Sequence, residues 1–242
     1  MTMETTRRTP RVSHGSVEWP PSEAGEPLEG AFGISLVIDH VVMAVRHLDD
    51  AGDRLLRDHG LASVPGGRHA RWGTANRVVP LGDDYIELIG VVDREQAAGT
   101  VFGRTTMDLT ADGDRWYAIC LASDDVDAIA HRLGLAIEPG ARTRPDGAEL
   151  RWRGAGLEAP ERDPWLPFFI TWDTSPELHP GRTPVEHPSG ATGIAWLELG
   201  GDEARLREWL GGAELPIRVV EGEPGLRAVG LRGSSGAEVV LR

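Results

Sequence analysis

The sequence predicts an α+β protein made of repeated βαβββ modules, whose strands form a curved mixed sheet, or cup. Short apolar runs bounded by turn-forming residues predict the strands, and a stretch of helical periodicity follows the first strand of each group. The same order of elements occurs three times along the chain. Three copies of roughly 50 to 60 residues are too long and too few for a solenoid, so we interpret them as duplicated sheet modules.

The first module opens with an apolar strand at Ile38–Val45. A helix follows, in which leucine and alanine recur at helical spacing from Leu48 until Gly60 ends it. Its three remaining strands are separated by glycine-containing turns and lie around Ser63-Val64, at Trp72–Leu81 and at Tyr85–Val92.

The other two modules repeat this order less regularly. The elements of the second are expected at Tyr117–Leu121, around Val126 to Leu133, at Glu149–Arg153 and at Leu166–Trp172. Those of the third are expected at Ile194–Leu199, Asp202–Leu210, Ile217–Glu221, Leu226–Leu231 and Ala237–Leu241. Two such modules usually face each other, so the third is left to pack beside them or to mediate a homodimer.

These patterns divide the chain into four segments. We expect a leader at 1–33, a domain of two modules at 34–175, a Pro-rich linker at 176–192 and a third module at 193–242. The leader has the Pro, Glu, Gly and Thr content of a disordered segment and no apolar core of the length that a signal peptide needs. A start site assigned too far upstream explains it equally well.

Composition excludes some classes of partner. The formal net charge of −13 argues against nucleic acid and against anionic membrane surfaces, because both are normally bound by a basic patch. No apolar run approaches the length of a membrane span. The single cysteine, Cys120, lies in an apolar run and reads as a buried hydrophobic residue; the absence of any intrachain disulfide fits a cytoplasmic location.

Two polar residues interrupt the apolar strands of the first module. His40 follows Asp39 near the start of the first strand, and Glu87 lies inside the last. A buried imidazole or carboxylate without a partner is costly, so we expect the two side chains to meet over the concave face of the sheet. There they either line a pocket or bind a metal.

A βαβββ unit that begins Asp39-His40-Val41 and ends with a strand carrying Glu87 resembles the glyoxalase, or vicinal-oxygen-chelate, superfamily. The segment from Gly66 to Ile89 is similar to the subgroup of glyoxalase-like domain proteins, and the likeness extends from about Ile38 to Asp173. The resemblance implies that paired modules close into a cup, in which first and last strands supply ligands to a divalent metal in many members, whereas other members bind a ligand without one.

Carried over to this chain, the resemblance makes His40 and Glu87 the metal ligands, with Zn, Ni, Fe or Mn as the candidate cofactor. The second module departs from the pattern: Ala118 stands where a second histidine would match, and the last strand has no carboxylate before Asp173. Half of the usual ligand set is therefore missing, unless His187 of the linker or Glu238 of the third module completes it.

Other residues are candidates for contact with a small-molecule ligand. If Asn76 faces the cup, then strand alternation turns Arg77 to the other side. The densest aromatic cluster of the chain lies in the last strand of the second module, and part of it must be plain core. The predicted substrate-binding residues are His69, Trp72, Asn76, Phe169 and Trp172.

Two functions remain open at this point. The first is a glyoxalase-like enzyme of the lyase or isomerase type, in which Glu87 moves a proton on a carbonyl or vicinal-oxygen substrate and a metal, if bound, acts as Lewis acid. The second is a non-catalytic protein of the same fold that binds or sequesters a small molecule in the aromatic cup. A structural role for the third module is a further alternative.

Overall fold

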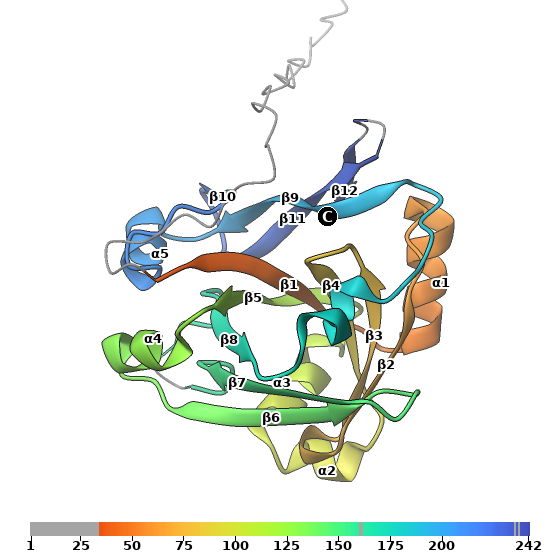
Figure 1. The fold of residues 1–242 in the computed structure, drawn as a ribbon, viewed down its shortest axis with the longest axis horizontal. Coiled ribbons are helices and arrows are strands. Elements are labelled where there is room, and N and C mark those ends of the chain that lie inside the picture. Colours follow the sequence, from red (N-terminus) through yellow and green to blue (C-terminus); the bar gives the residue numbers. More distant parts are fainter. Residues whose placement is uncertain (1–33, 160–161, 235, 237) are drawn as a thin grey trace, which may run out of the picture.

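The structure, a computed structural model, describes residues 34–159, 162–234, 236 and 238–242 (Figure 1). The leader predicted at 1–33 lies outside the described residues. Among the helices of the described ranges, none is long and apolar enough to cross a membrane.

The first module has the predicted order of elements. It contains β1 (Leu36–Ala44), α1 (Leu48–His59), β2 (Val64–His69), a 3-10 turn η1 (Ala70–Trp72), β3 (Thr74–Pro80) and β4 (Tyr85–Val91). Helix α1 ends where Gly60 takes a left-handed conformation (φ 64°) and its N–H bonds back to the last turn, as the sequence predicted. Trp72 lies in η1 and not in β3, because Gly73 (φ 65°) turns the chain before the strand begins.

The second module follows two helices that the sequence analysis did not predict. They are α2 (Arg94–Ala98) and α3 (Val101–Leu109), each started by a side-chain N-cap, Asp93 and Thr100 respectively. The module itself contains β5 (Arg115–Ser123), α4 (Val126–Leu133), β6 (Ile137–Thr143), β7 (Glu149–Ala155) and β8 (Phe168–Trp172). Strand β6 was also not predicted.

These two modules close into one barrel with the strand order β1-β4-β3-β2-β6-β7-β8-β5. The α+β fold with a curved mixed sheet is therefore confirmed, and the cup is a closed barrel. Within each module the first and last strands pair in parallel, β1 with β4 and β5 with β8. The two seams between modules differ: β1 and β5 pair along most of their length, whereas β2 and β6 share only the pair Arg68–Thr143.

The C-terminal segment has the βαβββ order but a different sheet. Two short 3-10 turns, η2 (Pro176–Leu178) and η3 (Pro180–Arg182), lead to β9 (Ala191–Gly200), α5 (Glu203–Trp209), β10 (Ile217–Val220), β11 (Gly225–Gly233) and β12 (Glu238–Leu241). Their sheet order is β10-β9-β11-β12, so the first strand pairs with the second and third and not with the last. The repeat seen in sequence is thus one of element order and not of strand pairing.

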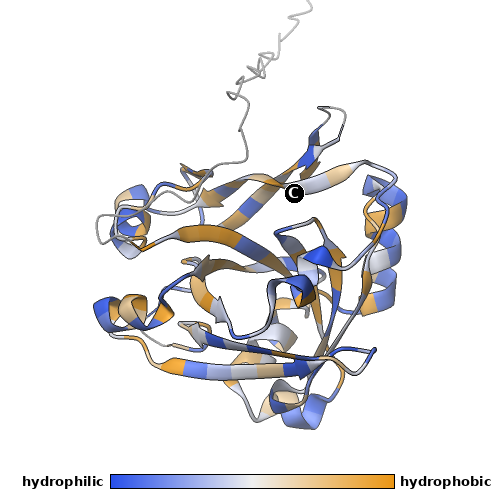
Figure 2. Cartoon of the chain, in the orientation of Figure 1, coloured by the Kyte–Doolittle hydropathy of each residue, from blue (hydrophilic) through white to orange (hydrophobic). Residues whose placement is uncertain are grey.

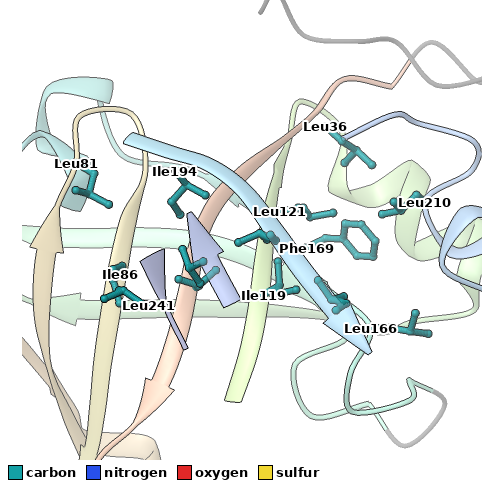
Figure 3. Packing of buried hydrophobic residues seen from close by; sticks show 14 of the residues in the cluster. Leu36, Leu81, Ile86, Ile119, Leu121, Leu166, Phe169, Ile194, Leu210 and Leu241 are labelled. Carbon is teal, nitrogen blue, oxygen red and sulfur yellow. The ribbon is translucent and has the colours of Figure 1, made fainter. Parts of the chain in front are cut away.

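This C-terminal sheet lies against the outside of the barrel, over β1 (Figure 1). The core between the two includes Ile119 and Leu121 of β5, Phe169 of β8 and Ile194 of β9, all 3% exposed or less (Figure 3). Strand β1, which is hydrophobic along most of its length in Figure 2, has this core on one face and the barrel interior on the other. The strand that carries Asp39 and His40 is therefore buried on both faces.

Candidate functional site

His40 and Glu87 do meet inside the barrel. Their strands are parallel neighbours, and Glu87 pairs with Val42, two residues beyond His40 on the same face of β1. The His40 Nε2 atom lies 3.7 Å from Glu87 Oε2, and their side chains are 5% and 12% exposed. This separation is too long for a direct hydrogen bond and leaves room for a ligand atom that touches both.

Asp39 holds the other side of the His40 ring. An irregularity in the β1–β5 pairing between Ile38 and His40 leaves Asp39 as an extra residue, so two consecutive side chains reach the buried network. Asp39 Oδ1 lies 2.5 Å from His40 Nδ1, and Oδ2 accepts hydrogen bonds from Trp172 Nε1 (2.8 Å) and His179 Nε2 (3.1 Å). The carboxylate thus gathers three N–H donors.

These contacts determine the charge of Asp39. Burial by itself would raise the pKa of this carboxyl, but the hydrogen bonds and charges of His179 and His40 hold it well below its usual range. Asp39 is therefore ionised and accepts the Nδ1–H of His40. The Nε2 atom of His40 then faces Glu87 and the cavity.

A second imidazole flanks Glu87 on the opposite side. His69 Nε2 lies 4.0 Å from Glu87 Oε1, and His69 Nδ1 lies 3.2 Å from Thr74 Oγ1. Burial lowers the pKa of His69 to about 4, although the charge of Glu87 opposes this effect, so the ring is neutral at physiological pH. The Asn76 amide donates to Glu87 Oε1 at 2.5 Å, which leaves Oε2 for His40 and the cavity.

Aromatic side chains form the rest of the cavity. Tyr85 stacks on the His40 ring with 4.4 Å between centroids, and Phe168 meets that ring edge-on at 5.7 Å. The remaining apolar walls come from η1, α3, β7 and β8, with Trp72, Phe102, Trp152, Ile170 and Trp172. The polar groups thus come mainly from the first module and the apolar wall mainly from the second. The cavity holds about 50 Å³, enough for a few water-sized groups.

Of the predicted binding residues, His69, Trp72, Asn76 and Trp172 line or support this cavity. Phe169 does not face it: the side chain is fully buried on the other face of β8, where it stacks on Trp209 with 6.1 Å between centroids. Its neighbour Phe168 faces the cavity instead. Both faces of β8 are covered, so alternation of polarity along the strand gave no means of choosing between them.

The residues suggested to complete the ligand set lie elsewhere. His187 bonds to the backbone of Ala62 and Pro80, outside the cavity, and Glu238 accepts a hydrogen bond from Trp196 in the C-terminal sheet. The linker does supply a histidine, but it is His179, which acts on Asp39. A histidine in a Pro-rich link gives no periodic signal, so the sequence offered no sign of its position.

Two residues that sequence reasoning missed also line the cavity. Arg142 of β6 is 6% exposed, and its NH1 group has no hydrogen-bond partner among the described residues. Phe102 of α3 packs on Trp72 at 4.8 Å between centroids. Both belong to elements that were not predicted. Arg77, in contrast, points away from the barrel interior, as alternation from Asn76 predicted, and bonds to Ser63 and Asp49.

The donor set of His40 and Glu87 fits a divalent metal. Two metal–ligand bonds of about 2.0 to 2.2 Å span up to roughly 4.4 Å, and the measured 3.7 Å lies within that reach. Each donor also has an orienting partner, Asp39 for His40 and Asn76 for Glu87, as metal ligands usually do.

A second cluster fits a metal less well. Asp39, His40 and Cys120 each place one donor atom within 4.8 Å of the others. However, Asp39 already accepts three hydrogen bonds, and burial raises the pKa of the Cys120 thiol, so the thiol stays protonated. The prediction that Cys120 is a buried hydrophobic residue agrees with this environment.

Comparison with known proteins places this geometry in a family. Residues 38–214 match the family described as "Glyoxalase-like domain", whereas no characterised protein in the sequence comparison matches the chain. Among solved structures, a hypothetical protein from Staphylococcus aureus is similar with a TM-score of 0.64 and 16% identity, over 86% of this chain and 99% of that chain.

Methylmalonyl-CoA epimerases are more distant in structure. The Mycobacterium tuberculosis enzyme has a TM-score of 0.41 and 20% identity, over 65% of this chain and 95% of that chain. The Streptomyces coelicolor enzyme in complex with 2-nitronate-propionyl-CoA has a TM-score of 0.43 and 19% identity, over 58% and 100%. Since the family match covers well over half of the sequence and the barrel has the expected strand pairing, the chain belongs to the glyoxalase-like domain family.

Proposed function

We propose that this protein is a glyoxalase-like enzyme of the lyase or isomerase type, which moves a proton on a small carbonyl or vicinal-oxygen substrate inside the barrel. The observation that carries the proposal is the buried chain Asp39–His40···Glu87, with 3.7 Å between an imidazole nitrogen and a carboxylate oxygen. Proton transfer needs an acid and a base held on opposite sides of one reacting group, and this pair faces one cavity.

Each residue has a separate part in the proposed reaction. Glu87 Oε2 takes the proton from the carbon next to the substrate carbonyl, since Oε1 is already held by Asn76. With both ring nitrogens protonated and Nδ1–H held by Asp39, His40 donates its Nε2 proton to the substrate oxygen as the C–H bond breaks. It takes this proton back when Glu87 returns a proton to carbon. The aromatic wall excludes water, which strengthens these interactions and protects the carbanion-like transition state.

His40 and Glu87 would also hold a divalent metal, with neutral His69 as a neighbouring donor. A bound metal would supply Lewis-acid polarisation of the substrate oxygen. Positioning of the substrate by Asn76 and the aromatic wall is the same with or without it.

The second candidate is a non-catalytic binding protein. It is favoured by the apolar half of the cavity, where β5 and β8 carry Ala118, Phe168 and Ile170 and no carboxylate or imidazole. A binder needs shape and apolar area but no proton transfer. The two candidates therefore differ in what Glu87 does to a bound ligand.

Hydrogen–deuterium exchange separates them. The protein is incubated in D₂O with small 2-oxo acids, hydroxyketones and aldehydes, and loss of the proton next to the carbonyl is followed by NMR. We expect exchange that is lost in Glu87→Gln and strongly reduced in His40→Asn. Glu238→Gln, at the matching position of the third copy and exposed, is the control and should exchange like the unsubstituted protein.

Binding is measured on the same compounds by thermal shift. Ligands that stabilise the protein but never exchange would refute the enzyme and favour the binder. For the metal, protein purified without an affinity tag is examined by elemental analysis, with His40→Asn as the comparison. A stoichiometric metal that disappears in this variant supports ligation, and metal-free protein with full exchange activity refutes it.

A further inference from the structure

Arg142 is a buried cation whose Nη1 atom has no hydrogen-bond partner in the part of the chain that the structure describes. It projects from β6 into the cavity that His40, His69 and Glu87 line, and only 6% of its surface is exposed. Burial lowers its pKa, while the nearby Tyr85 and Glu87 raise it, and a guanidinium stays protonated in proteins. Leaving one N–H group of a buried charge unpaired is costly, so a partner from outside the chain is expected there.

The Asn76 side chain leaves a second unpaired atom at the same place. Its amide nitrogen bonds to Glu87, but Oδ1 is buried and has no hydrogen-bond partner among the described residues. A Cβ built on Gly66 would lie 2.2 Å from Asn76 Oδ1 and 3.0 Å from Arg142 NH1. The two atoms therefore border the same space, which exists because residue 66 has no side chain. One supplies a donor with positive charge and the other an acceptor.

This space lies at the weak seam of the barrel. Strands β2 and β6 pair only through Arg68 and Thr143, and Gly66 and Arg142 stand beside that pair. A surface pocket of about 230 Å³ is also lined by Gly66, Arg142 and Arg144. Arg142 thus lines both the interior cavity and the surface pocket, so an anion can reach the guanidinium from the surface.

From these observations we infer that Arg142 binds the carboxylate of the substrate, which is then a small acid with a carbonyl or hydroxyl group on the neighbouring carbon. This inference rests on the proposed function and names its substrate class. Arginine pairs with carboxylates in a fork geometry, and Asn76 Oδ1 can accept from a hydroxyl on the adjacent carbon. The remaining substituent of such an acid packs on the aromatic wall.

The arrangement places the reacting carbon between two groups. Among the described residues, Arg142 forms no ion pair within 4.0 Å with Glu87. The two charged groups are near each other, and both remain available to a ligand. A carboxylate on Arg142 puts the oxygen of the next carbon toward His40 and the C–H bond beside that carbonyl toward Glu87. Neutral ketones of the same shape lack this contact and have only the aromatic wall to bind.

The test compares three small probes of matched size that suit a cavity of about 50 Å³: 2-oxobutyrate, butan-2-one, which lacks the carboxylate, and butyrate, which lacks the carbonyl. Binding to the full chain is measured by calorimetry and by quenching of tryptophan fluorescence. We expect 2-oxobutyrate to bind at least 10-fold more tightly than butan-2-one, with butyrate between them. Equal binding of acid and ketone, or no binding of any probe, overturns the inference without the use of any variant.

Variants then locate the contact. Arg142→Met keeps the apolar stem and should weaken the binding of 2-oxobutyrate 10- to 100-fold while leaving that of butan-2-one unchanged, and Arg142→Lys should recover part of the loss. Arg144→Met changes an arginine whose charge is already paired with Asp146 at 3.1 Å, and should weaken the acid less than 3-fold. A larger loss in Arg144→Met than in Arg142→Met would put the carboxylate in the surface pocket and refute the inference.

The outcome is separable from that of the proposed function. Acid binding that depends on Arg142, without deuterium exchange, supports the anion site and refutes the enzyme. Exchange on neutral ketones as fast as on acids supports the enzyme and refutes the anion site.

Discussion

Asp84 offers a quantitative test of how the C-terminal sheet is attached to the barrel. It ends the turn between β3 and β4, is 8% exposed, and accepts the backbone N–H of Ile194 in β9 at 3.0 and 2.9 Å. Burial raises the pKa of this carboxyl from 3.8 to about 7, even though the hydrogen bond from Ile194 and the charge of Arg232 oppose the shift. The folded protein therefore retains a proton that the unfolded chain releases.

The sign and size of the effect follow from this difference. Below pH 3.8 the carboxyl is protonated in both states and costs nothing; as pH rises toward 7 only the unfolded chain ionises, so stability falls. Each pH unit in that window is worth about 1.4 kcal/mol. From pH 5 to pH 8, Asp84 should therefore lower the free energy of unfolding by up to about 3 kcal/mol, and most of this decrease should occur below pH 7.

The substitution Asp84→Asn keeps the shape and the oxygen that accepts from Ile194, but it cannot ionise. Urea unfolding followed by tryptophan fluorescence at pH 5, 6, 7 and 8 gives the free energy of unfolding of both proteins. We expect the variant to gain on the unsubstituted protein by about 1.4 kcal/mol per pH unit up to pH 7 and no further above it. The pKa of His69 is lowered to about 4, so this residue makes the protein less stable as pH falls. This effect is the same in both proteins and cancels when their free energies of unfolding are subtracted.

A matched control lies next in the chain. Asp83 is exposed and pairs with Arg182 at the surface, so Asp83→Asn should change stability by less than about 1 kcal/mol at every pH. A difference between the Asp84 variant and the unsubstituted protein that stays constant from pH 5 to pH 8 would refute the buried, proton-retaining carboxyl. So would a variant that is less stable at pH 8.

Three further substitutions test other parts of the structure by urea unfolding. Gly66→Ala forces a Cβ against Asn76, and this overpacking should cost about 1 to 3 kcal/mol; an unchanged midpoint would mean that the carboxamide lies elsewhere. Trp172→Phe removes the hydrogen bond to ionised Asp39 and should cost about 1.5 to 3 kcal/mol, and a loss below half of this would contradict the three-donor arrangement. Phe169→Ala empties the core beneath the C-terminal sheet and should cost about 3 to 5 kcal/mol, whereas a surface-like loss below 1 kcal/mol would contradict its burial.

The sequence was sufficient to locate the polar half of the site. His40 and Glu87 stand out because each interrupts an apolar strand, and a buried polar group needs a partner. Their meeting requires that the two strands be neighbours in one sheet, which the resemblance to the glyoxalase superfamily implied and the pairing of β1 with β4 provides. Asp39 is next to His40 in the sequence, but its contact with the His40 ring depends on a local irregularity in the pairing of β1 with β5. No residue pattern predicts that irregularity.

Arg142, which forms the proposed anion site, was missed for a different reason. Strand β6 contains Pro139 and Gly140, which lower the expectation of a strand, and so the strand that carries Arg142 was not predicted. Tertiary context overrides this weak propensity, because β7 pairs with β6 along its whole length. Gly140 in turn lets the Trp152 ring lie across β6, since a Cβ there would stand 2.1 Å from the indole.

The C-terminal sheet has a structural consequence for the site as well as for the fold. By covering the outer faces of β1 and β5, it fixes the strand that carries Asp39 and His40 between two packed cores. An ionised carboxylate is expensive in such a place unless its donors stay within hydrogen-bond distance, and these donors come from β1, β8 and the linker. Since rigid surroundings preserve such geometry, the third copy, whose described residues do not line the cavity, supports the orientation of the His40 ring. The open sheet of this copy supplies the apolar face that packs on the outside of β1 and β5.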